Sequence, residues 1–572
     1  MNREPRREQG AVRKTWAGRV SIALIFPNTY AVGMANLGLQ AVYRLLNRHD
    51  GLAAERVFRP PGGPSAPWIS EESGRPLADF DLVLFSLSFE ADYPGVPAAL
   101  RASGIAPRAA ERGGAAPLVL AGGVAAMINP EPVAPFLDAV LLGEFEAQSE
   151  VFARLAPHLA NRDLSREERL HRLRADVPGT YVPALYRPRW TRDGRFAGFA
   201  PGAGIPIPVV PARADPGAGA APATRVRSPD AAFGDMHMVE LARGCGRGCR
   251  FCAAGFVYRP PRPWPAAAIR AALDARAEAG RVGLVGLEFL GRREVEEICE
   301  GLLREGISLG FSSLRADAVT PRFARLLAAS GARVATLAPE AGSERLRRVL
   351  NKNLSEADLL RAADALAGAG IPNLKLYLML GLPTETEADV RAAADLVERI
   401  REVLLAHGRR RGRLGRITVT AASFVPKAWT PFQWAAFDPG GCLARHRRLL
   451  SRLVGPIPNV RLRLDSMREA RLQAVLSRGD RRLAPVLERV AGGQAFAKAL
   501  SAEGLRADLY TRERSRDEPF PWEIAGHGVR RAYLLAEWDR AHREKSTPFC
   551  RPAGCSRCGA CGDRPGGVRG RP

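Results

Sequence analysis

Short apolar stretches recur through the first 150 residues, and segments with helical periodicity separate them. Val20–Phe26 is apolar and rich in β-branched side chains, which is typical of a buried strand. Alternating strands and helices predict an α/β fold, here a Rossmann-like doubly wound sheet whose ligands bind beyond the carboxyl ends of the strands. The other strand-like stretches are 82–87, 117–121 and 139–142, and the helix-like ones are 38–46 and 94–102.

The same alternation begins again at residue 236. Six further strand-like stretches each lead into a polar loop or a helical segment. This pattern predicts a partial (β/α)6 barrel, in which the active site lies at the carboxyl ends of the strands. The chain after residue 436 is mainly helical. The six stretches are 238–242, 284–290, 308–314, 334–338, 374–380 and 417–421.

The Pro/Ala/Gly-rich stretch 211–222 is typical of a linker and helps to place the domain boundaries. The segment before it contains an expected hairpin whose first strand is 181–186 and whose turn is Asp193-Gly194. The expected organisation is a disordered arm (1–18), a Rossmann domain (19–150), a connector (151–235), a barrel (236–435), a helical region (436–545) and a cysteine-rich tail (546–572).

Composition adds little about partners. The formal charge of +24 favours a polyanionic substrate such as RNA, but the excess is scattered and carried by arginine. Alanine, glycine and proline are also abundant, which indicates a general compositional bias. There is no apolar run of about 18 residues and no apolar signal segment at the N-terminus. We therefore expect a cytoplasmic protein without a membrane partner.

Three of the nine cysteines, Cys245, Cys249 and Cys252, follow the first barrel strand with the spacing C-x3-C-x2-C. Three thiolates can hold three irons of a [4Fe-4S] cubane and leave the fourth iron open for another ligand. Gly244, Gly246 and Gly248 permit a tight backbone around such a cluster. The alternatives are a three-cysteine zinc site and surface thiols, but structural zinc prefers four ligands.

Four more cysteines form the end of the chain: Cys550, Cys555, Cys558 and Cys561. So short a segment cannot bury its own core, so metal binding is expected to order it. Four thiolates suit a second [4Fe-4S] cluster or zinc. The sequence favours the cluster, and a tail of free thiols is the remaining alternative.

The cysteine spacing, with Phe251 before the last cysteine, resembles the signature of radical SAM enzymes. Longer motifs resemble an uncharacterised group of these proteins with a cobalamin-binding-like domain before the barrel. The motifs lie at 26–38, 122–132, 338–347, 375–386 and 424–434.

The resemblance implies a [4Fe-4S] cluster whose open iron binds S-adenosylmethionine, and a reductant such as flavodoxin or ferredoxin. It also raises cobalamin as a cofactor. The D-x-H-x-x-G signature, whose histidine ligates cobalt, is absent from this chain. Cobalamin would therefore bind without a protein histidine.

The resemblance also assigns cofactor-binding residues. Glu340 and Ser343 match positions that contact the ribose and carboxylate of S-adenosylmethionine, and Gly381 and Pro383 match the segment that holds adenine. Glu288 is the candidate for the cofactor's amino group, because the usual serine-rich or Gly-Gly-Glu-like segment is missing. The alternatives are ordinary barrel turns, and for Glu288 a salt bridge within the barrel.

We expect a radical SAM enzyme that generates a 5′-deoxyadenosyl radical and modifies RNA, protein or a small molecule. Cobalamin-assisted methylation, methylthiotransferase-like chemistry and oxidoreduction all remain open. The rival hypothesis is a non-catalytic nucleic-acid-binding protein whose metal clusters are structural. Salt-dependent RNA binding without cleavage of S-adenosylmethionine would favour that rival.

Overall fold

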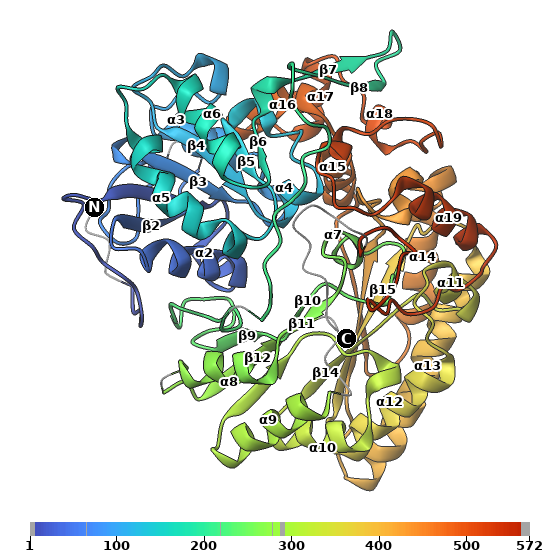
Figure 1. Ribbon diagram of the computed structural model, residues 1–572. Coiled ribbons are helices and arrows are strands. Elements are labelled where there is room, and N and C mark those ends of the chain that lie inside the picture. The colour runs from blue at the N-terminus through green and yellow to red at the C-terminus, as the bar shows by residue number, and fades with distance from the viewer. Residues whose placement is uncertain (1–5, 64–65, 218, 277, 287–291, 562–572) are drawn as a thin grey trace. The chain divides into compact units, whose positions relative to one another are not determined.

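The computed structural model describes residues 6–63, 66–217, 219–276, 278–286 and 292–561 (Figure 1). The chain divides into two compact units, and each combines segments that are distant in the sequence. The helical region near the C-terminus contributes to both. The first unit holds Met1–His237, Val475–Thr511 and Asp517–His527, and the second holds Met238–Ala474, Arg512–Arg516 and Gly528–Pro572.

The first unit is built on a six-stranded sheet with the order β2-β1-β3-β4-β5-β6. The strands from β2 to β5 are parallel, and β6 runs antiparallel to β5. The chain passes from β1 to one side for β2 and returns to the other side for β3. This creates a switch point between β1 and β3, where ligands of such sheets bind. The strands are β1 Val20–Phe26, β2 Leu52–Phe58, β3 Leu82–Ser86, β4 Leu118–Gly122, β5 Ala139–Leu141 and β6 Thr180–Tyr181.

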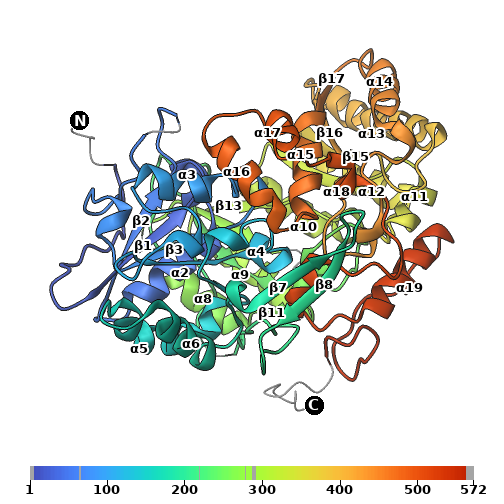
Figure 2. The ribbon, with the colours of Figure 1, turned by 90° about the horizontal axis from the view of Figure 1, so that it is seen from above.

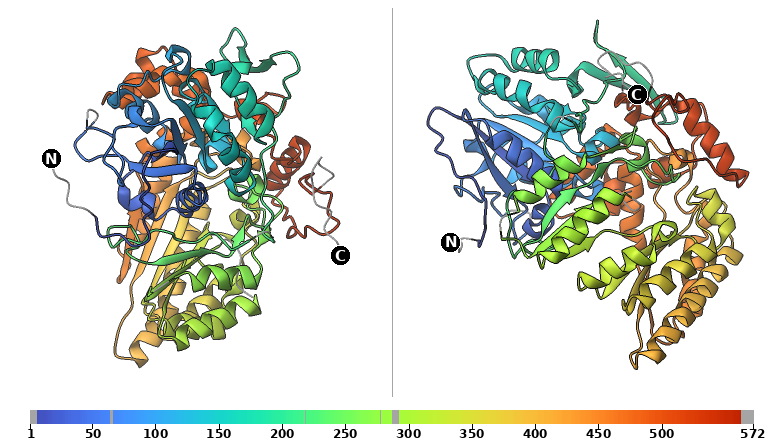
Figure 3. Two further views of the ribbon diagram at one scale, coloured as in Figure 1. Left: turned by 60° about the vertical axis from the view of Figure 1, so that its left-hand side comes forward. Right: turned by 60° about the horizontal axis from the view of Figure 1, so that its bottom comes forward.

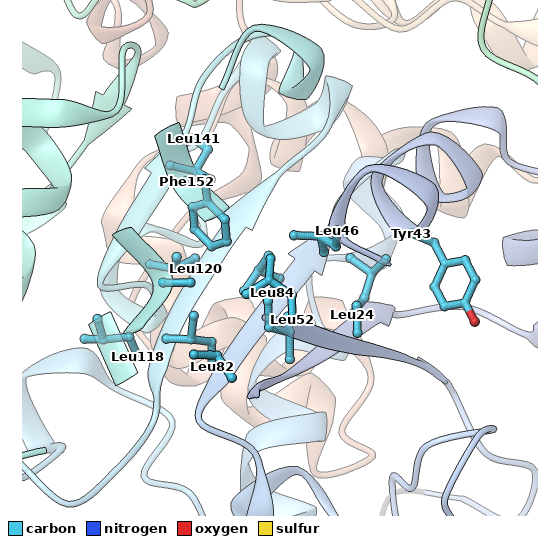
Figure 4. Close-up of a cluster of buried hydrophobic side chains, with 14 of the residues drawn as sticks. Leu24, Tyr43, Leu46, Leu52, Leu82, Leu84, Leu118, Leu120, Leu141 and Phe152 are labelled. Carbon is cyan, nitrogen blue, oxygen red and sulfur yellow. The ribbon is translucent and has the colours of Figure 1, made fainter. Parts of the chain in front are cut away.

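Every residue of β1, β2 and β3 is buried. Successive side chains of a strand point to opposite faces, so burial of all of them requires cover on both faces. On one face, Leu24, Leu84 and Leu120 belong to a core cluster that includes side chains of helices α2 and α5 (Figure 4). The helices of this unit before the barrel are α1 Tyr30–Met34, α2 Leu37–Asn47, α3 Gly95–Ala102, α4 Val124–Ile128, α5 Ser149–Ala160 and α6 Arg166–Asp176.

Two details of the first unit differ from the sequence expectation. The hairpin is formed by β7 (Tyr186–Trp190) and β8 (Phe196–Pro201), a long ribbon in Figure 2. Its turn lies at Asp193-Gly194 as expected, but Tyr181 instead extends the main sheet by pairing with Val140. Residues 6–18 differ from the expected disordered arm, because Lys14 donates hydrogen bonds to three carbonyl oxygens at Asn47, His49 and Leu52.

The C-terminal part of the first unit packs on the sheet domain. Helix α16 (Ala484–Ala491) contacts α3, and Arg108 donates to Glu488 at 2.8 Å. The Asn129 amide donates to the carbonyl oxygens of Ser477 and Gly479 at 3.2 and 2.9 Å. The residue after α4 is therefore hydrogen-bonded to a segment more than 300 residues away in sequence. The remaining helices here are α17 Phe496–Ala502 and α18 Ala507–Thr511.

The second unit contains the barrel strands, which form two sheets with the orders β13-β12-β9 and β14-β15-β16-β17. A parallel bridge from Leu314 to Leu337 connects the segment after β13 with β14. The seventh strand, β17, was not expected from the sequence. The strands are β9 His237–Glu240, β10 Ala242–Arg243, β11 Arg262–Pro263, β12 Arg281–Val285, β13 Ser308–Phe311, β14 Val334–Glu340, β15 Asn373–Leu380, β16 Ile417–Ser423 and β17 Val460–Leu464.

A continuous layer of helices covers the outer side of these strands (Figure 1; Figure 3, right). Neighbouring helices contact each other in the order α8, α9, α10, α12, α13 and α14. Their apolar sides bury alternate strand residues, as β15 illustrates with Leu374, Leu376 and Leu378 buried and Lys375 and Tyr377 exposed. The helices are α7 Ala254–Val257, α8 Ala266–Asp274, α9 Arg293–Arg304, α10 Pro321–Ala329, α11 Glu344–Val349, α12 Glu356–Gly368, α13 Glu387–Arg410, α14 Leu443–Val454, α15 Met467–Ser477 and α19 Arg531–His542.

The architecture confirms the predicted fold class: a Rossmann-like sheet, a partial α/β barrel and a mainly helical C-terminal region. Among the described residues, no helix is both long enough and apolar enough to cross a bilayer.

Candidate functional site

The cysteine loop, Cys245–Cys252, begins directly after β10 and turns sharply. Gly244 and Gly248 adopt φ angles of +80° and +69°, a backbone region that favours glycine. A Cβ on Gly244 would lie 2.6 Å from the Tyr258 carbonyl oxygen, so the turn has no room for a side chain there. Cys245, Cys249 and Cys252 form no disulfide, and the three residues are partly exposed. This donor set fits an iron–sulfur cluster, which thiolates ligate.

Two polar side chains fix the backbone of the cysteine loop. The Asn351 amide donates to the carbonyl oxygens of Arg247 and Gly248 at 3.1 and 3.2 Å. The Arg250 backbone N–H donates to the Leu350 carbonyl oxygen at 2.9 Å, and its buried guanidinium forms an ion pair with Glu537 at 3.1 Å. The loop is thus held to the segment after α11 and to helix α19.

Charged groups lie close to the thiols. Lys352 forms an ion pair with Glu340 at 3.0 Å. Burial alone would lower the pKa of Lys352, but the charges of Glu340 and Cys249 raise it above its ordinary value. Burial, assisted by Cys249, raises the pKa of the Cys252 thiol to about 11. The Cys252 thiol is therefore neutral until something replaces its proton, as metal binding does.

The cysteine-rich tail contacts the cysteine loop directly. The Cys550 N–H donates to the Gly246 carbonyl oxygen at 2.8 Å. A Cβ on Gly246 would lie 2.4 Å from the Phe549 ring, so glycine lets this ring pack on the loop. The Thr547 N–H donates to the Asn351 side-chain oxygen at 2.8 Å. Asn351 therefore holds both cysteine segments.

Cys550, Cys555 and Cys558 line a pocket together with Arg247, Arg259 and Tyr533. Arg530 fixes this part of the tail, since its N–H donates to the Cys558 carbonyl oxygen at 2.8 Å and its guanidinium donates to two further carbonyls. Within the described ranges, no three His, Cys, Asp or Glu side chains converge closely enough to hold a single metal ion.

The cofactor residues implied by the resemblance lie at the carboxyl ends of β14 and β15. Glu340 ends β14 with a φ of +66°, and Gly381 follows β15 with a φ of +81°. The Gly381 N–H donates to Glu385 at 3.0 Å, and Glu385 contacts the buried His446 at 2.5 Å. The turn that contains Pro383 is therefore connected through Glu385 to His446 of helix α14.

Ser343 is used by the protein itself. Its hydroxyl accepts from the Leu346 N–H at 3.1 Å as the N-cap of α11, and it also donates to Asp389. Glu288 lies outside the described residues.

The sequence interpretation missed the segment Asn351-Lys352-Asn353. Asn351 and Asn353 have φ angles of +54° and +50°. Asparagine tolerates this left-handed region better than most residues, so two asparagines directly after a helix were an available turn signal. Nothing local in the sequence indicates that the Asn351 side chain reaches the cysteine loop.

The carboxyl edge of the N-terminal sheet has a polar group at the β1/β3 switch point. Asn28 donates to Asp92 at 2.8 Å, and Asn36 donates to Ser88 at 3.1 Å. Burial raises the pKa of Asp92 to about 6, and its Oδ2 has no hydrogen-bond partner among the described residues. The ring of the neighbouring Phe89 is 48% exposed.

The β4 side of the same edge is tightly packed. Gly123 has a φ of +98°, and a Cβ there would lie 2.4 Å from the Leu87 carbonyl oxygen. Glycine at position 123 therefore lets the chain after β4 pass close to the Leu87 backbone.

Family models match both parts of the chain. Residues 38–183 match the N-terminal domain of radical SAM proteins, and residues 239–397 match the radical SAM superfamily. A curated relative, an uncharacterized protein of Methanocaldococcus jannaschii (MJ0966), is 24% identical over 85% of this chain and 94% of its own length.

Solved structures with a similar fold include the cobalamin-dependent radical enzyme OxsB. Its form with aqua-cobalamin and S-adenosylmethionine aligns at 14% identity and a TM-score of 0.44, over 92% of this chain and 79% of that chain. Its form with aqua-cobalamin alone aligns over 66% of this chain and about half of that chain (52%), with a TM-score of 0.41. The coproporphyrinogen III oxidase HemN of Escherichia coli aligns over 33% of this chain and 43% of its own, at 16% identity and a TM-score of 0.24.

The family resemblance expected from the motifs is confirmed by the two family-model matches. A radical SAM domain indicates an enzyme and implies a [4Fe-4S] cluster, S-adenosylmethionine and an electron donor. With its N-terminal domain and its barrel both matched in the expected order, this chain belongs to the radical SAM superfamily.

Proposed function

We propose that Cys245, Cys249 and Cys252 hold the [4Fe-4S] cluster of a radical SAM enzyme that modifies a separate substrate. When bound and reduced, the cluster supplies the electron that splits S-adenosylmethionine into methionine and a 5′-deoxyadenosyl radical. The observation that supports this most is the bracing of the cysteine loop. Its turn is held by Asn351 and Arg250, so the three thiols are positioned without a disulfide.

Lys352 and Arg315 bring positive charge to the cysteine loop. Arg315 is ion-paired with Asp317 at 2.9 Å, and its pKa is raised because Asp317, Cys249 and Cys245 outweigh its burial. Nearby cations stabilise thiolates, the form in which cysteine binds metal. In this proposal the two cations therefore favour loading of the cluster.

Glu340, Gly381 and Pro383 would contact S-adenosylmethionine at the carboxyl ends of β14 and β15. Glu340 stands at the end of its strand and forms an ion pair with Lys352. Gly381 presents main-chain groups without a side chain. Ser343 acts by positioning, because it caps α11 and hydrogen-bonds Asp389. Glu288 remains a proposed contact for the amino group.

The test uses full-length protein purified and reconstituted without oxygen, with dithionite or flavodoxin as reductant. We expect cluster absorbance, about 4 irons per cluster and formation of 5′-deoxyadenosine. Changing all three cysteines of the loop to alanine should abolish that product, with Cys299→Ala, a buried cysteine of α9, as the matched control. Undiminished product from the triple variant would contradict the proposal.

The tail cysteines Cys550, Cys555, Cys558 and Cys561 are proposed to hold a second [4Fe-4S] cluster, with zinc as the competing metal. The hydrogen bond from Cys550 to Gly246 and the Phe549 contact support a centre close to the first cluster. A redox centre there could relay electrons or bind substrate, whereas zinc could not accept an electron. About 8 irons per chain, falling to about 4 after truncation at Pro548, is the expected result. Four irons and one zinc in the intact chain would refute the second cluster.

A corrinoid is the further proposed cofactor, at the β1/β3 switch point of the first unit. The polar residues Asn28, Ser88 and Asp92, together with the exposed Phe89, support a ligand there. The residues named here include no histidine, so the proposed corrinoid would have no histidine ligand on its cobalt. If it binds, methyl transfer is the reaction it favours. Anaerobic incubation with hydroxocobalamin followed by gel filtration should yield a corrinoid spectrum with the protein, and none from a denatured control. A protein without that spectrum would refute this cofactor.

A further inference from the structure

One face of the sheet β14-β15-β16-β17 carries three cationic side chains, and the seven residues that define this face below include no carboxylate. The inner face is defined here by Thr336, Lys375, Tyr377, Thr418, Thr420, Arg461 and Arg463. Their side chains alternate with buried residues on β14, β15 and β16, and with partly buried residues on β17. The buried residues face the helices; α14, for example, packs on β15 and β17. The inner face is thus the side of the sheet turned away from the helix layer.

The strand register places the inner-face residues in two rows. Lys375 pairs with Thr418, and Thr418 pairs with Arg461. One level nearer the carboxyl ends, Tyr377 pairs with Thr420, and Thr420 pairs with Arg463. Two residues on one strand are about 6.6 Å apart, and two strand spacings are about 9.6 Å. The three cations therefore form a triangle whose sides are about 7–12 Å between Cα atoms.

The side chains of Lys375, Arg461 and Arg463 are exposed. None of these three side chains makes a hydrogen bond or ion pair with any residue that the structure describes. Other arginines of the second unit do form ion pairs, for example Arg447 with Asp465 and Arg345 with Asp389. The neighbouring Tyr377, 39% exposed, and the two threonine hydroxyls add groups that can contact a ligand.

An alternative explanation is protection of a sheet edge. Charged side chains on edge strands prevent pairing with other chains, and β17 ends this sheet. That explanation covers Arg461 and Arg463, but it does not cover Lys375, because β15 lies between β14 and β16. A cation on a central strand, level with Arg461, indicates a function of the face and not of the edge.

We propose that the inner face binds the substrate of this enzyme, and that this substrate is a small molecule with at least two anionic groups, such as a diphosphate or a phosphate with a carboxylate. This inference rests on the proposed function, since it names the substrate class of the same barrel. Guanidinium groups bind phosphate and carboxylate oxygens through paired hydrogen bonds, and Lys375 acts as a point charge. Tyr377 packs against the uncharged part of the substrate, and Thr418 and Thr420 donate hydrogen bonds.

The number of cations favours a small molecule over a nucleic-acid strand. Proteins that bind nucleic acid through its backbone commonly contact about 6–10 phosphates. The inner face offers three cations on two rows, which match two or three anionic groups of one molecule.

The test measures anion binding by calorimetry with the full-length protein, in the absence of reductant and S-adenosylmethionine. The probes are inorganic pyrophosphate, inorganic phosphate and a short single-stranded RNA. We expect pyrophosphate to bind at least about tenfold more tightly than phosphate, because it reaches two cations at once. Its affinity should fall about tenfold in Arg461→Gln and in Arg463→Gln, and less in Lys375→Gln.

The matched control is Arg391→Gln, an exposed arginine on the outer helix α13 without a described partner; it should bind pyrophosphate as the unchanged protein does. Arg463→Lys, which keeps the charge, should restore part of the affinity, and thermal melting of each variant verifies folding. Equal affinities in Arg391→Gln and Arg463→Gln would overturn the inference. So would RNA binding that needs these residues while pyrophosphate does not bind.

Failure of this inference and failure of the proposed function give different results. Absent pyrophosphate binding in a protein that forms 5′-deoxyadenosine would refute the anionic substrate and leave the radical enzyme intact. Pyrophosphate binding that depends on Arg461 and Arg463, in a reconstituted protein that never cleaves S-adenosylmethionine, would keep the inner-face site and refute the radical chemistry.

Discussion

The N-terminal sheet is parallel from β2 to β5 and the sheet β14-β15-β16-β17 is parallel throughout, but the two sheets are buried differently. In the N-terminal sheet every residue of β1, β2 and β3 is buried, so both faces contribute to the core. In the sheet β14-β15-β16-β17, the central strands β15 and β16 alternate buried residues with partly or fully exposed ones. The first sheet can bind a ligand only at its edge, whereas the second offers a whole face. The difference separates a sheet that serves mainly as a scaffold from one that can hold a substrate.

The largest effect should come from neighbouring residues of β1. Leu24 and Ile25 point to opposite faces and are 1% and 0% exposed. Leu24→Ala and Ile25→Ala should each lower the free energy of unfolding by about 3 kcal/mol, because each leaves a cavity. Urea unfolding followed by circular dichroism measures this. A loss of unfolding free energy at only one of the two positions would contradict burial on both faces.

Alanine substitutions at two neighbouring residues of β15 should, in contrast, give unequal effects. Leu376 is 1% exposed and Tyr377 is 39% exposed. Leu376→Ala should cost about 3 kcal/mol, and Tyr377→Ala less than about 1 kcal/mol, since the tyrosine ring buries little area. Similar losses at both positions would show that the inner face is filled by protein and would remove the distinction between the sheets.

A third prediction concerns Asn351, in the segment after α11. Asn351→Gly keeps the left-handed backbone but removes the amide that holds Arg247, Gly248 and Thr547. We expect a loss of about 2 kcal/mol and fewer irons per chain after reconstitution, because buried carbonyl groups lose their donor. The matched control is Asn353→Gly, an exposed asparagine with a φ of +50°, which should lose only a few tenths of a kcal/mol. Equal iron content in the two variants would show that Asn351 does not contribute to cluster loading.

The smallest effect tests the edge of the N-terminal sheet by pH. Burial raises the pKa of Asp92 to about 6, above its unfolded value near 4, so the folded protein binds more protons between these pH values. Stability attributable to Asp92 should therefore fall as pH rises from about 4 to about 6. The difference in unfolding free energy between Asp92→Asn and the unchanged protein should therefore be about 1–2 kcal/mol more favourable to the variant at pH 8 than at pH 4. Urea unfolding of both proteins at each pH measures this difference. A gain that does not change with pH would assign the effect to something other than Asp92 ionisation.

Much of the fold could be predicted from local patterns. The strands Val20–Phe26 and Asn373–Leu380 stood out because one is continuously apolar and the other alternates, and these patterns correspond to burial on two faces and on one face. The strand β17 was missed because Val460–Leu464 is short and carries two arginines. The first hairpin strand was misplaced because Tyr181 pairs with Val140, a choice that depends on which edge of the sheet is free.

The candidate site could be predicted only in part. The spacing of Cys245, Cys249 and Cys252 indicated cluster chemistry, because ligands close in sequence must be close in space. The braces from Asn351 and Arg250 could not be predicted, since their partners lie about 100 residues away or more. The same holds for Lys375 and Arg461, whose common row exists only through the strand register.

By itself, the sequence determined the order of the elements, the family of the barrel and the two cysteine segments, because these depend on local periodicity and short spacing. Only the tertiary structure decided that the tail reaches the cysteine loop, that the C-terminal helices divide between two units, and that three cations share one uncovered face. The reason is physical: helices and strands follow from neighbouring residues, whereas contacts between distant segments depend on how buried faces pack together.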